Sequence, residues 1–398
     1  MKIFPATRAA WIRCIAPVVL MGAGAGAWLA WHPGQTLRTG AHDLGSNGVW
    51  MAHGWLADDQ WFMQNAERAS QLPLYHNTPS VIAALQEHKN RGMGHVFLDL
   101  YPCATDGSLP PASISGAEML GLQAAHLGIH AWPWVGGTRG ENCFPEKPEW
   151  RRTFVSSCRD LLLKCPDLAG VLVNVEPWPE NDPHMPALLD ELRQAMPKGR
   201  HVAVAAFPPP TLFQPGRSNH WGKAYFQSVA AKSDLLVVMM HDTGLSNDKL
   251  FTHLIECWTK ESVQWAGETP VLLGIADYET PTPQPWHHAP TETLEHALSG
   301  IHAGLSSFGV MPGNYRGVAV FADYTMDARK WNVWETEFCA PRKKITVDKP
   351  PTLEDLMKGA VADAGRRPPG KAQGKTAPPV KHSAPEPPPM LRRPPSGP

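Results

Sequence analysis

Short apolar runs alternate with longer segments of helical periodicity between about residue 48 and residue 338. The short runs are rich in β-branched and aromatic residues, which predicts strands at Val49–Trp55, His95–Tyr101, Ile129–Val135, Gly170–Glu176, His201–Phe207, Leu235–His241, Pro270–Ala276 and Gly317–Asp323. The longer segments predict helices at Ser80–Arg91, Gly116–Leu127, Glu149–Lys164, Met185–Ala195, Lys223–Ala231, Lys249–Trp265, Thr291–Ser307 and Ala328–Phe338. Regular strand-then-helix alternation predicts parallel strands joined by crossover helices.

Eight such units favour a closed barrel over an open sheet. In a (β/α)8 TIM barrel each strand is covered on both faces, which explains runs that are apolar nearly throughout. An open doubly wound α/β sheet is the alternative, but no glycine-rich phosphate turn follows the first strand. We therefore expect one α/β barrel domain at residues 39–340, between a signal or anchor segment at 1–38 and a tail at 341–398.

The amino-terminal segment resembles an export signal. Basic residues within the first 13 positions precede an apolar stretch at residues 14–31, and small residues at 25–27 offer a cleavage site. The stretch also approaches the roughly 20 residues that span a bilayer, so a cleaved signal and a retained membrane anchor both remain open. Either outcome predicts an exported protein, periplasmic or extracellular.

Charge is divided unevenly along the chain, although the formal net charge is only −1. Residues 1–38 carry four basic and no acidic residues, and residues 341–398 carry twelve basic and five acidic residues, which leaves −12 for residues 39–340. An acidic domain argues against nucleic acid as a partner. The proline-rich basic tail is predicted to be disordered, as a spacer or as a segment that binds a partner.

Six cysteines follow the export segment, and their even number permits disulfides in an oxidising compartment. Cys103 and Cys143 fall in successive loops on one predicted barrel face, so we expect this pair to be bonded, with buried free thiols as the alternative. No spacing is typical of a zinc site, and we expect neither a metal nor a cofactor.

The chemistry of such barrels lies at the carboxyl ends of the strands, where this chain is rich in polar and aromatic residues. The candidates are Asp99, Tyr101, Trp132, Trp134, Asn174, Glu176, His241, Asp242, Asp277, Tyr278, Glu279, Asp323 and Tyr324. Aromatic faces suit the apolar faces of sugar rings, which adds Trp55, Trp178 and Trp286, although core packing explains any one tryptophan equally well.

Glu176 is the strongest candidate for a catalytic acid. Leu172, Asn174 and Glu176 share one side of their strand, so the two polar side chains are expected to point into the barrel mouth. Burial there would raise the pKa of the carboxyl group and keep it protonated near neutral pH. The structural alternative is a glutamate that caps the barrel end or pairs with a Lys or Arg residue.

His241 and Asp242 end the sixth predicted strand and form a second candidate pair. His241 could donate a hydrogen bond to a sugar, and Asp242 could tune Glu176 across the barrel. A structural histidine and a helix-capping aspartate are the alternative.

At these two strand ends the sequence resembles the family-18 glycoside hydrolases, the chitinases and their relatives. That family closes its fourth strand with Asp-Gly-x-Asp-x-Asp-x-Glu, where this chain has Ala169-Gly170-Val171-Leu172-Val173-Asn174-Val175-Glu176, and closes its sixth with Met-x-Tyr-Asp, where this chain has Met239-Met240-His241-Asp242. The resemblance implies a TIM barrel in which Glu176 protonates the glycosidic oxygen and Asp242 assists. Leu172 and Asn174 stand where the family has aspartates, and no tryptophan closes the eighth strand, so we expect a divergent relative with another glycan as substrate.

Three functions remain open from the sequence. The first is a monomeric glycosidase with Glu176 as general acid and a second carboxyl group from Asp242, Asp277, Glu279 or Asp323. The second is a barrel of the cell envelope that binds carbohydrate without catalysis. The third is a structural envelope protein in which the tail at 341–398 is the working part.

Overall fold

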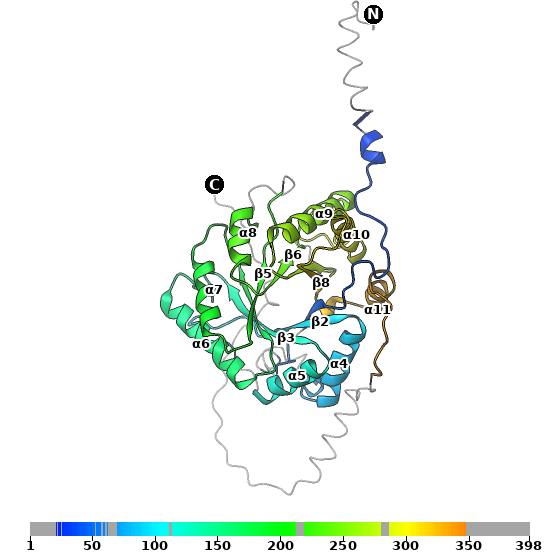
Figure 1. The fold of residues 1–398 in the computed structure, drawn as a ribbon. Helices are drawn as coiled ribbons and strands as arrows, with labels where there is room; N and C mark the ends of the chain where they lie inside the picture. The colour runs from blue at the N-terminus through cyan, green and yellow to red at the C-terminus, as the bar shows by residue number, and fades with distance from the viewer. Residues whose placement is uncertain are drawn as a thin grey trace, which may run out of the picture.

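The computed structural model describes residues 26–51, 53–56, 70–110, 114–211, 219–279 and 286–347, together with positions 21, 23, 24, 59 and 62. Their strands form one closed barrel in the order β1-β2-β3-β4-β5-β6-β7-β8, and every neighbouring pair is parallel. Helices surround the barrel on the outside (Figure 1). The prediction of a single eight-stranded α/β barrel is confirmed.

The strands are β1 (Asn47–Met51), β2 (Met93–Asp99), β3 (His130–Thr138), β4 (Gly170–Glu176), β5 (His201–Ala206), β6 (Leu235–Met239), β7 (Val271–Ala276) and β8 (Tyr315–Phe321). The helices are α3 (Leu72–Tyr75), α4 (Thr78–Asn90), α5 (Ile114–His126), α6 (Pro148–Lys164), α7 (His184–Ala195), α8 (Lys223–Ala230), α9 (Asp248–Trp265), α10 (Leu294–Ser306) and α11 (Ala328–Val333). A 3-10 turn at Asp323–Thr325 follows β8, and a π-helical turn at Trp334–Phe338 follows α11.

Several predicted boundaries are wrong, and the backbone gives the reasons. β1 ends at Met51 and not at Trp55, and Gly54 beyond it has a positive φ of 99°, which a strand does not allow. α10 begins at Leu294 and not at Thr291, because the Thr293 side chain caps the helix by accepting a hydrogen bond from a backbone N–H of its first turn. The segment 291–293 is therefore a loop beside the barrel mouth.

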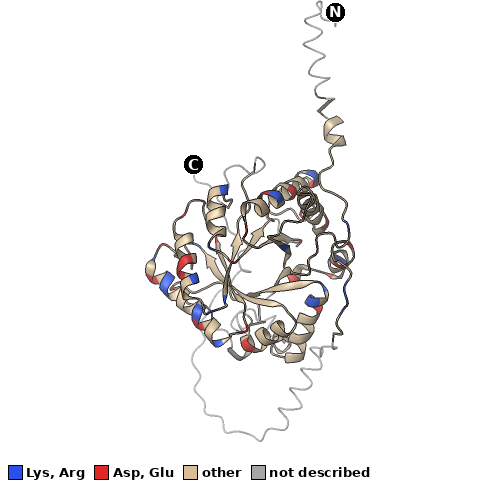
Figure 2. Ribbon diagram, viewed as in Figure 1, with Lys and Arg blue, Asp and Glu red and all other residues tan. Residues whose placement is uncertain are grey.

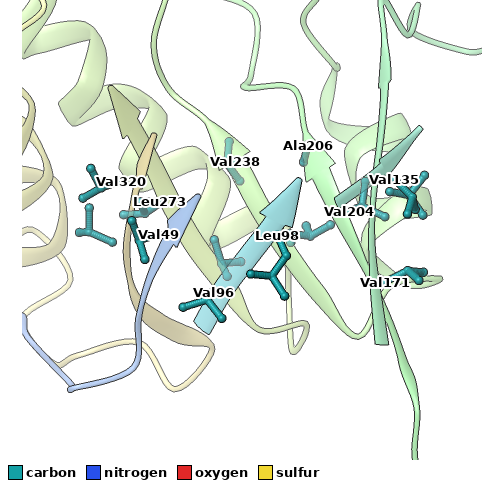
Figure 3. Packing of buried hydrophobic residues seen from close by; sticks show 14 of the residues in the cluster. Val49, Val96, Leu98, Val135, Val171, Val204, Ala206, Val238, Leu273 and Val320 are labelled. Atoms are coloured by element: carbon teal, nitrogen blue, oxygen red, sulfur yellow. The ribbon is translucent and has the colours of Figure 1, made fainter. Parts of the chain in front are cut away.

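The alternation of side chains along each strand divides the core into two layers. Val171, Val173 and Val175 point outward and pack in the large cluster between the strands and the helices, part of which Figure 3 shows. Leu172 points inward and joins Trp50 and other side chains in a separate cluster that fills the barrel interior. The interior is a packed core, as expected for eight strands, so that a site can form only at an open end.

Asp43 joins the segment before β1 to the segment after the barrel. One of its carboxylate oxygens accepts hydrogen bonds from Gly45 N and Asn47 Nδ2, and the other accepts from Ala340 N and from the guanidinium of Arg342. The Asp43 side chain is fully buried. This carboxylate therefore links the segments before and after the barrel at the amino end of β1.

Charged side chains lie mainly on the surrounding helices (Figure 2). The described residues of 21–30 are helical and project from the barrel domain (Figure 1), and Met21, Trp28 and Leu29 among them are exposed. The Lys249 ammonium of α9 donates hydrogen bonds to the backbone oxygens of Trp28 and Leu29. Within the part of the chain that the structure describes, no helix has the length and apolar character needed to cross a membrane. Residues 1–20 and the tail beyond 347 lie outside the described residues, so the expected signal and tail stay predictions.

Candidate functional site

Asn174 and Glu176 lie together at the carboxyl end of β4. Asn174 Nδ2 donates a hydrogen bond of 2.8 Å to Glu176 Oε1, so the two side chains share one side of the strand. Glu176 is only 8% exposed, and Asn174 is also buried. Among the described residues, no hydrogen-bond partner reaches Glu176 Oε2 or Asn174 Oδ1, and no Lys or Arg pairs with Glu176. Both of these oxygens are therefore buried without a hydrogen-bond partner among the described residues.

A glycine on β3 lets the backbone approach this pair. Gly136 lies opposite Asn174 in the strand register and has a φ of 136°. A Cβ atom at Gly136 would lie 1.8 Å from the carbonyl oxygen of Asn174, so no other residue fits without moving β3 away from β4. The close pairing of β3 and β4 places Thr138 beside Glu176.

Burial raises the pKa of Glu176 above its ordinary value. The hydrogen bond from Asn174 and the nearby His241 act in the opposite direction, whereas the charge of Asp242 raises the pKa further. Burial is the largest of these effects, so the net shift of the Glu176 pKa is upward.

Aromatic rings surround the mouth on the side of β2, β3 and β8. Tyr101 and Trp134 stack with ring centroids 4.9 Å apart and an interplanar angle of 22°. Phe321 packs edge to face against Trp134 at 6.1 Å and stacks on His241 at 5.7 Å. Trp134 is half-buried, and its indole N–H has no hydrogen-bond partner among the described residues. Trp134 thus combines an apolar ring with a buried indole N–H that has no partner among the described residues.

Asp242 follows β6 and receives several donors. Its Oδ2 lies 3.3 Å from His241 Nδ1, its Oδ1 lies 3.2 Å from His287 Nδ1, and the Tyr278 hydroxyl donates a hydrogen bond to Oδ1. Although burial acts to raise the pKa of Asp242, these histidines and the hydroxyl outweigh burial and lower it. Burial likewise disfavours the charge of His241, but the carboxylate of Asp242 raises the pKa of His241.

The surroundings shift the pKa values of Glu176 and Asp242 in opposite directions although both are buried. Burial raises the pKa of Glu176, whereas His241, His287 and the Tyr278 hydroxyl lower the pKa of Asp242. A pair of carboxyl groups whose pKa values are pushed apart is the arrangement that divides the roles of acid and base between two residues.

Three predicted tryptophans have contacts outside the group around Glu176. Trp132 sits deeper in the barrel and donates a hydrogen bond of 3.1 Å to His95, near the amino ends of the strands. Trp178 is fully buried in the outer layer, where its N–H donates to Tyr225. Trp55 packs on Tyr75 at the edge of the outer layer. None of the three belongs to the group around Glu176.

Three of the remaining predicted carboxyl groups lie close to a Lys or His side chain. Asp277 forms a buried ion pair of 2.9 Å with Lys330 and accepts a hydrogen bond from the backbone N–H of Leu294 at the start of α10. Asp99 lies 3.2 Å from His53 Nε2, and Asp323 lies 3.9 Å from His88 Nε2. The structure places Glu279 and Tyr324 in exposed positions and Trp286 in a half-buried one.

The predicted Cys103–Cys143 disulfide is absent, although the structure brings the two residues together. Both are buried free thiols with their sulfur atoms 3.5 Å apart, whereas an S–S bond measures about 2.05 Å. The cysteines thus pack the loops after β2 and β3 against each other without a covalent bond.

Sequence reasoning missed Phe321, His287 and Glu292. Phe321 carried a usable signal, because it shares a side of β8 with the inward Ala319. The sequence pattern held no signal for the other two residues, because His287 lies in a loop and Glu292 lies in a segment that was predicted to be helical. Asp242, His287 and Glu292 place one ligand atom each within 4.8 Å of one another, so these three residues also form the one group in the described part of the chain that could hold a metal ion.

No protein-family model matches the sequence, and no curated protein sequence matches it. Three similar solved structures are the spore cortex-lytic enzyme SleL of Bacillus cereus (11% identity, 65% of this chain and 70% of that chain, TM-score 0.46), a chitinase from Chromobacterium violaceum (12%, 73% and 98%, TM-score 0.46) and a fungal endo-beta-N-acetylglucosaminidase from glycosyl hydrolase family 18 (16%, 74% and 96%, TM-score 0.47).

Proposed function

We propose that the protein is a glycoside hydrolase in which Glu176 is the general acid. The observation that carries the proposal is a buried carboxyl group at the carboxyl end of a barrel strand, with one oxygen free and no cation paired to it among the described residues. A buried carboxyl group with one unpartnered oxygen and no paired cation is costly for the fold, and such groups are found mainly where function requires them.

In the proposed reaction, the proton of Glu176 passes to the glycosidic oxygen as the bond between that oxygen and the anomeric carbon breaks. The hydroxyl group of a water molecule adds to the anomeric carbon, and the remaining proton of that water returns to the carboxyl pair. Asp242 is the second carboxyl group, because its charge acts on Glu176 and its own donors keep it ionised. Asp277 is excluded from this role by its ion pair with Lys330.

The substrate is proposed to be a poly- or oligosaccharide. Trp134 and Tyr101 offer flat faces beside the acid, and the free indole N–H and the Asn174 Oδ1 offer one donor and one acceptor for sugar hydroxyl groups. We place the protein outside the cytoplasm on account of residues 14–31. Fractionation of cells that express the full chain tests this location, and recovery in the cytoplasmic fraction alone would contradict it.

The experiment is hydrolysis of a panel of envelope and plant glycans by the wild-type chain and by Glu176→Gln. Glutamine keeps the shape of the side chain but has no acidic proton. We expect wild-type turnover of at least one glycan and a loss of about 10²-fold or more in the variant. Wild-type activity that survives in Glu176→Gln excludes Glu176 as the acid, and binding without turnover by the wild type identifies a carbohydrate-binding barrel instead.

A further inference from the structure

Behind Asp242 lies a second layer of buried ionisable side chains. His287 precedes α10 in the chain, and its Nδ1 lies 3.2 Å from Asp242 Oδ1 and 3.7 Å from Glu292 Oε2. The side chains of His287 and Glu292 are both 0% exposed. A histidine that faces two carboxyl groups in a fully buried position requires an explanation, because each of these groups is costly to bury alone.

The hydrogen bonds define the protonation of His287. Its Nε2 lies 2.9 Å from the carbonyl oxygen of Tyr278, which can only accept, so Nε2 carries a hydrogen. Its Nδ1 faces the oxygens of Asp242 and Glu292 and no donor that the structure describes. Nδ1 thus faces only acceptor atoms, and a hydrogen on this second ring nitrogen would make the side chain an imidazolium ion.

Glu292 has the hydrogen bonds of a carboxylate. Its Oε1 accepts from the backbone N–H groups of Gly244 and His288, and its Oε2 accepts from that of Thr243. Both oxygens therefore act as acceptors, and one side of Oε2 is left for His287. Because Thr243 and Gly244 directly follow Asp242, Glu292 also fixes the backbone that carries Asp242.

We propose that His287 is a positioning residue: clamped as an imidazolium between Glu292 and Asp242, it holds the Asp242 carboxylate against His241, beside Glu176. This inference deepens the proposed glycosidase and rests on it for its functional part. The protonation of His287 can be measured without any activity.

The electrostatics of the cluster agree with this arrangement. Burial disfavours the charge of His287, but Asp242 and Glu292 outweigh burial and raise its pKa to about 10. The Tyr278 ring stacks on the imidazole at 4.0 Å with an angle of 11°, and His241 lies on the far side of Asp242. The arrangement is thus two carboxylates bridged by one cation, with a second histidine toward the active site.

A divalent metal ion is the competing occupant of the same three residues. The contacts favour the proton, because three backbone N–H groups and a hydroxyl group already donate to the two carboxylates.

The first test is nuclear magnetic resonance of the full chain labelled with ¹⁵N-histidine, with His287→Gln used to assign the resonance. Two protonated ring nitrogens at His287 between pH 6 and pH 8 are expected. A neutral ring at pH 7 overturns the proposal, and so does stoichiometric divalent metal in protein that was purified without chelators.

The second test is kinetic and compares His287→Gln with the matched control His288→Gln. The His288 ring nitrogen Nδ1 is hydrogen-bonded to the Thr291 hydroxyl and does not contact the side chains of Asp242, His287 and Glu292 that form the clamp. We expect kcat of His287→Gln to fall at least tenfold with KM changed less than twofold, while the control keeps both constants. A kcat close to that of the wild type refutes the positioning role. If the variant does not fold, or if the wild type hydrolyses no glycan, the nuclear magnetic resonance and metal measurements still decide whether the clamp exists.

Discussion

The hydrogen bond from Asn174 to Glu176 provides a quantitative test of the site. The 2.8 Å bond favours the ionised form of Glu176, in opposition to burial. Asn174→Leu removes the donor and leaves burial and Asp242 in place, so the pKa of Glu176 should rise. A hydrogen bond to a charged group contributes about 1.5 kcal/mol, which corresponds to about a tenfold change in the equilibrium between the carboxyl group and the carboxylate.

The assay is the pH profile of kcat/KM. A general acid works in its protonated form, so the alkaline limb should move to higher pH in Asn174→Leu. Infrared titration of the Glu176 carboxyl group, assigned with Glu176→Gln, measures the same change without turnover. Asn332→Leu on the exposed surface of α11 is the matched control. An alkaline limb and a carboxyl titration that both stay in place, or move to lower pH, refute this electrostatic account of the site.

Three further predictions concern stability and binding. Asp43→Ala should lower the free energy of unfolding by about 3 kcal/mol, because it leaves Arg342 and several buried donors without their acceptor. A loss of unfolding free energy below about 1 kcal/mol, measured by denaturation in guanidinium, would contradict this prediction. Burial lowers the pKa of His88 and of His95 to about 3, below the value of 6.5 expected in the unfolded chain. The stability that these neutral histidines contribute should therefore be complete above pH 6.5 and should decline as the pH falls toward 3. A melting temperature that stays constant over this pH range would contradict the prediction. Trp134→Ala should weaken glycan binding by about tenfold, as measured by calorimetry, and unchanged affinity would remove this ring from the substrate site.

Much of the fold could be predicted from the sequence because the barrel strands carry their own pattern. Gly170–Glu176 has the predicted bounds, since it is apolar on both faces until two polar residues end it. The predicted boundaries were wrong where a local side-chain interaction decides them. The Thr293 cap, for example, places the start of α10 at Leu294. Periodicity cannot distinguish a first helical turn from a capped loop, and the residues of this loop are the ones that support Asp242.

The site was predictable in part, for a related reason. Side chains at i and i+2 on one strand face the same way, so the pairing of Asn174 with Glu176 follows from the strand alone. The depth of a residue along the barrel axis depends on how neighbouring strands are staggered, and for this reason Trp132 was assigned to the mouth although it contacts His95 near the other end. The contact of His287 with Asp242 joins two loops and leaves no periodic signal in the sequence.

The most direct test of Glu176 as the acid compares two leaving groups. Protonation is needed to expel a sugar alkoxide and is not needed to expel a good leaving group such as dinitrophenolate. For the sugar that the glycan panel identifies, Glu176→Gln should lose about 10²-fold or more in kcat/KM on the oligosaccharide and less than about tenfold on the dinitrophenyl glycoside. An equal loss on both substrates would contradict the assignment of Glu176 as proton donor.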